Sequence, residues 1–180
     1  LKIDAGAGSF KIIEPTTDLI SVLALGLKDN YILNRTDSDN SASIELQMKK
    51  TKIKLQKGKY KNKIVTSLNA DPVWNLNFDL GAASLDFDLS FNKISTMKLD
   101  MGAASLNLKL GDKYPKTMLD VDAGASSVKI SIPDSSGCEI ITDVSISSKH
   151  FREFKCSQTP VREVLRQLES EGLLTFESNK

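Results

Sequence analysis

The sequence predicts an all-β protein: a repetitive β-solenoid or β-roll of stacked two-strand repeats, followed by a C-terminal amphipathic helix. The first observation is a phrase, Asp-x-Gly-Ala-x-Ser, whose copies begin at Asp4, Asp79, Asp100 and Asp122. The last three copies are 21 (79 to 100) and 22 (100 to 122) residues apart, a period typical of repeat architectures. The second observation is strict alternation of apolar and polar residues on both sides of these copies, which indicates half-buried strands.

The repeats fill residues 74–132, and each contains one strand before its glycine and one after it. The apolar positions before the glycine are Leu76, Phe78 and Leu80; Met97, Leu99 and Met101; and Leu119, Val121 and Ala123. Those after it are Leu85, Phe87 and Leu89; Leu106, Leu108 and Leu110; and Val128, Ile130 and Ile132. Stacked repeats should align equivalent side chains in buried columns. Two expected columns are Phe78–Leu99–Val121 and Phe87–Leu108–Ile130.

The segments around the repeats extend the β pattern. We expect earlier strands at residues 1–5, 10–13, 18–25, 31–33, 43–49 and 51–57, with a polar loop at 36–41. Small corner residues, such as Gly81, let the chain turn without pressing a Cβ atom against the next repeat. Closing strands are expected at 139–141 and 144–146, and the pattern changes after Lys155. The domains are therefore a repetitive β domain, 1–155, and a helical tail, 156–180.

Composition is that of a soluble globular protein and limits the possible partners. The chain has 180 residues, 40% apolar and 26% charged, with a formal net charge of +1. This charge favours neither nucleic acid nor a membrane surface, and no run is long enough to span a bilayer. Because Leu1 already belongs to a strand pattern, we expect a signal peptide or membrane tether upstream of it.

The sequence contains no recognisable catalytic arrangement. Its single histidine, His150, has no Ser/His/Asp pattern, phosphate loop or zinc-ligand spacing around it. Cys138 and Cys156 could form one disulfide or remain two unpaired small apolar residues. We predict neither an enzyme nor a cofactor.

Two sets of charged residues are candidate binding sites. Asp79, Asp100 and Asp122 occupy equivalent outward positions and are candidate calcium ligands. We favour solvated carboxylates, or carboxylates bonded to corner amides, since calcium usually takes six or more oxygens. The second set lies among eight lysines at positions 49–63, with no acid between Glu45 and Asp71. It offers a surface for an anionic partner, but we favour a role in protecting a strand edge. Its residues are Lys50, Lys52, Lys54, Lys57 and Lys59.

The opening residues 1–10, the stretch 74–82 and the Leu-x-Leu-x-x-Gly-Ala repeats resemble the toast-rack β domain over residues 1–150. That family is similar to LiaF-like cell-envelope stress proteins and to a group of candidate bacterial adhesins. The resemblance implies a non-catalytic domain, membrane-associated or extracellular, that acts in sensing, scaffolding or adhesion. Its implied partners are an envelope protein or an anionic envelope polymer, and it supplies no catalytic residue.

The tail has its own pattern and its own resemblance. Thr159, Pro160 and Gly172 suit a helix cap, first turn and stop. Residues 157–174 also resemble the recognition helix of GntR-type winged-helix repressors, which implies that Ser157, Thr159 and Arg162 face DNA. The alternative function is therefore a DNA-binding transcription regulator. Since the two supporting helices of a winged helix are missing, we favour a helix that caps the solenoid, and a fusion remnant stays open.

Overall fold

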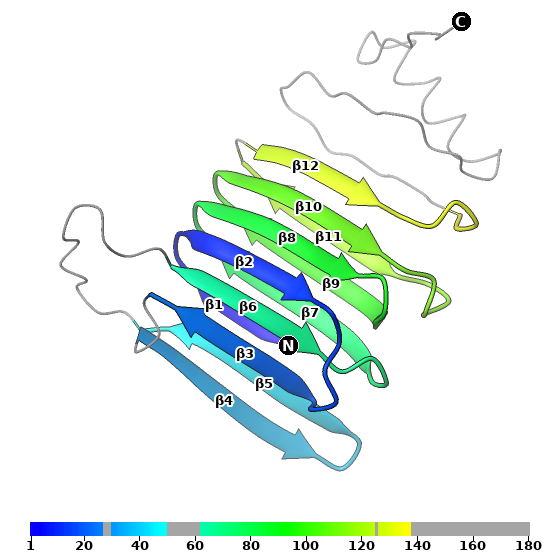
Figure 1. Ribbon diagram of the computed structural model, residues 1–180, viewed down its shortest axis with the longest axis horizontal. Helices are drawn as coiled ribbons and strands as arrows, with labels where there is room; N and C mark the ends of the chain where they lie inside the picture. Colours follow the sequence, from blue (N-terminus) through cyan, green and yellow to red (C-terminus); the bar gives the residue numbers. More distant parts are fainter. Residues whose placement is uncertain (27–29, 50–61, 125, 138–180) are drawn as a thin grey trace, which may run out of the picture. The chain divides into compact units, whose positions relative to one another are not determined.

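The computed structural model describes residues 1–26, 30–49, 62–124 and 126–137 (Figure 1). The chain divides into two units, Leu1–Ile132 and Pro133–Lys180. In the described part of the second unit, the Ser136 amide donates a hydrogen bond to the Pro133 carbonyl across a turn (3.0 Å). The expected strands at 51–57, 139–141 and 144–146 and the expected C-terminal helix lie outside the described residues. Within the described ranges no helix is long and apolar enough to cross a membrane.

The first unit consists of two six-stranded sheets, which confirms the all-β prediction for the described residues. Sheet A contains, in spatial order, β11 (Met118–Ala123), β9 (Lys93–Met101), β7 (Val73–Leu80), β1 (Lys2–Ala5), β5 (Ser41–Met48) and β4 (Tyr31–Ser38). Sheet B contains β12 (Ser126–Ser131), β10 (Ala104–Leu110), β8 (Ala83–Leu89), β2 (Gly8–Ile13), β6 (Lys63–Leu68) and β3 (Ile20–Leu25). All neighbouring strands are parallel except β5–β4 and β6–β3, which are antiparallel.

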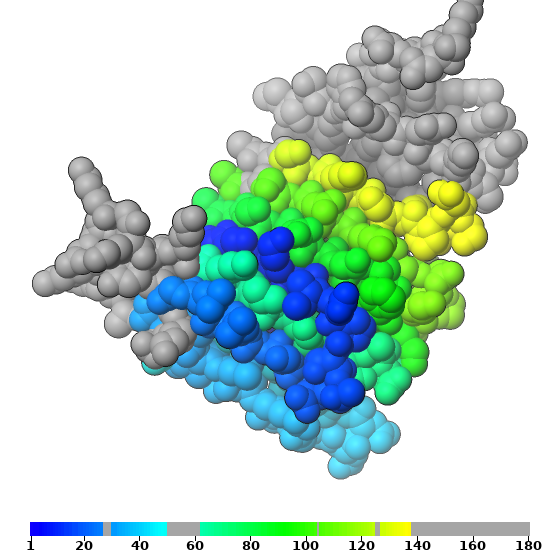
Figure 2. Space-filling view, viewed as in Figure 1, coloured from blue at the N-terminus to red at the C-terminus, as the bar shows by residue number. Residues whose placement is uncertain are grey.

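One strand from each sheet forms a rung of the sandwich, and the rungs do not follow sequence order. The β7/β8, β9/β10 and β11/β12 rungs succeed one another, as the repeats predict. The N-terminal β1/β2 rung, however, lies in the middle, between β5/β6 and β7/β8. Figure 2 shows its dark blue residues as a band flanked by later parts of the chain. The chain start is therefore paired on both sides.

The two predicted columns are present in the strand register. Phe78 pairs with Leu99 and Leu99 with Val121, and the column continues through Ile3 to Leu46 and Leu33. In sheet B the column runs from Ile130 through Leu108, Phe87, Ile12 and Thr66 to Val22. The columns face each other, since the rings of Phe78 and Phe87 lie 4.9 Å apart. These rows of inward side chains form the core of the sandwich.

Burial along the columns is not uniform, which corrects the expectation that every member is buried. Phe78, Leu99 and Leu108 are fully buried, whereas Val121 is half-buried and Ile130 is 37% exposed. The difference arises because β11 and β12 are the last strands in their sheets, so their inward side chains have a described neighbour on only one side.

Two local predictions differ from the structure. The segment 36–41 is not a loop: β4 and β5 form a hairpin that pairs Ser38 with Ser41 across Asp39 and Asn40. Asp and Asn favour such two-residue turns. The strand β6 was not predicted, although Ile64, Thr66 and Leu68 are buried and alternate with half-buried neighbours. A buried threonine breaks its apolar pattern.

Only some glycines of the repeated phrase are needed to avoid a Cβ contact with the next rung. A Cβ atom on Gly81 would lie 3.5 Å from the nearest atom, an ordinary contact, whereas one on Gly124 would lie 2.8 Å from the Gly102 carbonyl oxygen. The tightest position is Gly111, in the return turn after β10, where a Cβ atom would collide with the Ser90 carbonyl oxygen. Among the described glycines, the steric requirement for glycine is therefore strongest in a turn that the repeated phrase does not contain.

We expect Leu99→Ala to lower the free energy of unfolding by about 2–5 kcal/mol, because Leu99 is fully buried between Phe78 and Val121. Urea unfolding measures this loss. The matched control is Ile130→Ala, which should cost much less since that side chain is 37% exposed. A loss for Leu99→Ala below that of the control would contradict the column.

Candidate interaction surfaces

The aspartates of the repeated phrase form a single row on the outer face of sheet A. The register pairs Asp122 with Asp100, Asp100 with Asp79, and Asp79 with Asp4. Gln47 follows Asp4 in the same row. We call the four carboxylates the aspartate row. Asp4 was not among the predicted site residues, although the copy of the phrase at residues 4–9 contained the signal.

The aspartate row is not neutralised by other described side chains. Asp79, Asp100 and Asp122 are exposed and Asp4 is half-buried, and none of them joins a hydrogen bond or ion pair with a side chain in the described ranges. The next row holds both lysines of this region: Lys98 pairs with Asp120 (3.7 Å) and Lys2 with Glu45 (3.1 Å). The hydrogen bond to Glu45 raises the pKa of Lys2 most, followed by the negative charge of Glu45. The charges of Asp4 and Asp79 contribute less.

Together these two rows make one face of the sandwich acidic. They contain six acids and two lysines, a net charge of −4 (2 − 6). The carboxylates of the aspartate row are separated by single strand spacings of about 4.8 Å and lie in a line rather than around a point. Among the described residues no group of three or more His, Cys, Asp or Glu side chains could hold a metal ion.

The outer face of sheet B carries different chemistry. Ser9, Ser84, Ser105 and Ser127 form one row, in which the hydroxyls of Ser105 and Ser84 lie 3.4 Å apart. Asp86 accepts hydrogen bonds from the Lys11 ammonium (2.7 Å) and the Asn107 amide (3.0 Å). Both hydrogen bonds lower the pKa of Asp86, and the bond from Lys11 has the larger effect.

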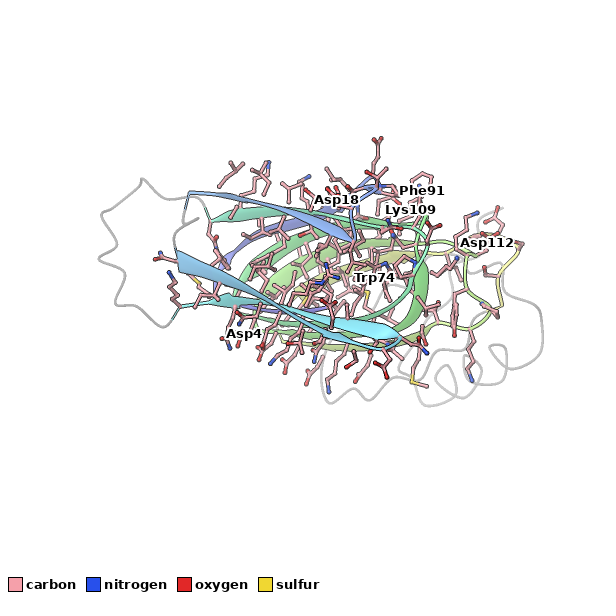
Figure 3. All side chains as sticks on the ribbon, turned by 90° about the horizontal axis from the view of Figure 1, so that it is seen from below. Asp4, Asp18, Trp74, Phe91, Lys109 and Asp112 are labelled. Carbon is pink, nitrogen blue, oxygen red and sulfur yellow. The ribbon has the colours of Figure 1, made fainter. Side chains whose placement is uncertain are left out.

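Charges on sheet B are therefore largely compensated. Lys109 pairs with Asp88 (3.3 Å). The serine row continues to Lys63, and the two rows beside it contain Lys11, Lys109 and Lys129 against Asp86 and Asp88. Figure 3 shows Asp4 and Lys109 on opposite outer sides of the two layers. The sandwich thus has one acidic face and one face with a small excess of lysines.

The predicted lysine surface, Lys50, Lys52, Lys54, Lys57 and Lys59, lies outside the described residues, but both ends of its segment are placed. Lys49 follows β5, and Asn62 precedes β6. The buried Asn62 amide donates to the Ala7 carbonyl (2.9 Å) and accepts from the Tyr31 hydroxyl (3.0 Å). Burial raises the pKa of that hydroxyl. The segment therefore rejoins the sandwich at a fixed corner of the β1/β2 rung.

The candidate DNA-contacting residues Ser157, Thr159 and Arg162 lie outside the described residues, as do His150, Cys138 and Cys156.

The stacked parallel rungs and their aligned outer rows define a β-repeat domain whose exposed features are broad sheet faces. By sequence, residues 1–131 match the N-terminal domain of toast-rack proteins, DUF2154. The chain belongs to this toast-rack family, which confirms the resemblance over that range. Comparison with curated proteins finds no significant match.

Among solved structures, the fold is similar to that of "a putative cell adhesion protein" from Clostridium sporogenes. The TM-score is 0.52 at 13% sequence identity, and the match covers 73% of this chain and 92% of that one. At this sequence identity, the similarity shows a shared fold alone.

We expect added calcium, or its removal with EDTA, to leave the melting temperature unchanged, because the aspartate row offers a line of carboxylates rather than a cage of six or more oxygens. Thermal unfolding with and without millimolar calcium checks this. A folded-state calcium site would stabilise the protein by about 2.7 kcal/mol at 100 times its dissociation constant. An upward shift lost in Asp79→Asn would contradict the prediction and identify the row as a metal site.

Proposed function

We propose that this chain is a non-catalytic domain of the bacterial cell envelope that acts in adhesion or scaffolding by holding an envelope protein against the outer face of sheet A. Membership of the toast-rack family and the fold shared with the Clostridium protein support this assignment. A role in sensing, as in the LiaF-like proteins, belongs to the same proposal. Its location is the envelope, membrane-associated or extracellular.

The observation that carries the proposal is the regular outer face of sheet A. Parallel register aligns equivalent residues over successive rungs, so the aspartate of the repeated phrase recurs at each strand spacing. The aspartate row leaves this face acidic, while the lysines beside it are already paired. Electrostatic complementarity gives specificity and speeds association, so a basic surface on the partner would suit it. The outer face of sheet B has no such excess of acidic residues, since Asp86 and Asp88 are paired with lysines.

An anionic envelope polymer is the second candidate partner, and the lysine segment favours it. Removing its eight positive charges from the net +1 would leave −7 on the rest of the chain. Such a polymer would therefore bind Lys50, Lys52, Lys54, Lys57 and Lys59 and avoid sheet A. DNA binding by Ser157, Thr159 and Arg162 gains no support from the family match, which ends at residue 131.

The test places two arginines on either outer face of the same two rungs. Asp79→Arg with Asp100→Arg changes sheet A, and Ser84→Arg with Ser105→Arg is the matched control on sheet B. Co-sedimentation with purified envelope fractions should weaken roughly tenfold for the sheet A variant, since two charges of the contact become repulsive. The control should bind like the wild type. Binding of the wild type should also fall as salt rises.

Other outcomes distinguish the candidates. Binding that survives both face variants but is lost when the five lysines are replaced by glutamine would favour the polymer. A wild-type chain that does not bind envelope fractions, or two face variants that weaken binding equally, would contradict the proposal.

A further inference from the structure

We propose that the end of the sandwich formed by β3 and β4 is a self-association surface, where a second copy of this chain pairs through a two-fold axis. In the described part of the chain, β3 and β4 are the last strands of sheets B and A at this end. Each therefore presents one unpaired side of its backbone, which is a template for another strand. The pairing would be β3 with β3 and β4 with β4 of the two copies.

Apolar side chains are exposed at this end, as others are on β11 and β12. Leu23 and Leu25 on β3, and Ile32 and Leu33 on β4, are each at least 40% exposed. The inward side chains of Ile20, Val22, Ala24 and Tyr31 are half-buried and pack on the core from one side only. In a second copy the inward residues of β3 would cover Ile20, Val22 and Ala24 and extend the core through the interface.

The backbone groups on the unpaired sides of β3 and β4 can pair with the same groups of a second copy. The Asn69 amide donates to the Leu19 carbonyl, so the odd residues of β3 form the hydrogen-bonded pairs with β6. The Lys49 amide donates to the Asn30 carbonyl, so the even residues of β4 form those with β5. In the described part of the chain, Val22 on β3 and Leu33 on β4 therefore direct their amide and carbonyl groups away from the neighbouring strand. Every second residue from them along each strand does the same.

Val22 and Leu33 also lie at the same level of the two sheets. Leu33 ends the column that contains Phe78, and Val22 ends the column that contains Phe87. Since the two phenylalanine rings meet at 4.9 Å, the columns face each other across the core. One axis perpendicular to both layers can therefore pass between Leu33 and its copy and between Val22 and its copy. Both sheets would then become continuous antiparallel pairings, with Tyr31 opposite Arg35 of the second copy.

The charge distribution separates this end from the other one. β3 contains no charged residue, and the two charges of β4, Arg35 and Asp37, pair with each other at 2.8 Å. At the opposite end, β11 carries Asp120 and Asp122 and β12 carries Lys129. Charges on edge strands oppose pairing with another sheet. The β3/β4 end lacks that protection on one of its strands.

The test is the mass of the full chain in sedimentation equilibrium over a concentration series. The wild type should reach roughly twice the 19.7 kDa of one chain. Leu33→Lys should return it to the single-chain mass, because the lysine would lie directly opposite its own copy at the axis, and like charges in that position are destabilising. The matched control is Val128→Lys, also at an inward position of an edge strand and 44% exposed, which should keep the doubled mass.

Hydrogen exchange keeps the proposal testable if Leu33→Lys fails to fold. In the wild type, protection of the Val22 and Leu33 amides should rise with protein concentration, while that of β12 amides should not. A chain that stays at the single-chain mass overturns the proposal. Edge amides protected in such a monomer would show that another segment of the same chain covers this end. A doubled mass lost only in Val128→Lys would place the contact at the opposite end and also overturn it.

Discussion

The parallel register between rungs is the constraint on which the rest of the structure depends. A slip of one residue between β7 and β9 would turn Leu99 outward and Asp100 into the core, because side chains alternate between the two faces. The cost of burying an unpaired carboxylate and exposing a leucine column strongly opposes such a slip. The nearly constant repeat length thus specifies the core and both outer faces at once.

The same register explains the charge pattern of the faces. Because it aligns equivalent residues, a carboxylate in the repeated phrase necessarily lies beside its copies, as Asp79 lies beside Asp4 and Asp100. Like charges directly opposite each other are destabilising, and exposure to water reduces that cost. Outside the repeated phrase, the charges vary between rungs and pair across them, as Lys11 does with Asp86. An acidic row beside compensated rows is the result.

Sequence reasoning predicted the elements whose signal is local and repeated. The column Phe78–Leu99–Val121 follows from alternation and a nearly constant period. The position of the β1/β2 rung does not, because the distance in sequence between Asp4 and Asp79 hides their direct pairing. The strand β6 was missed because Thr66 occupies an inward position that an apolar pattern would assign to valine or isoleucine. The candidate surface was found only in part: three aspartates were predicted, and Asp4 joined them through topology.

The central claim is that the first strands of the chain occupy the middle of both sheets. Native-state hydrogen exchange tests it most directly, because protection reports the free energy needed to open each hydrogen bond. The amides of β1 and β2 should exchange as slowly as those of β7 and β8, since each strand is paired on both sides. Amides of β11 and β12 should exchange faster. Rapid exchange throughout β1, as in a frayed terminus, would contradict this arrangement of the rungs.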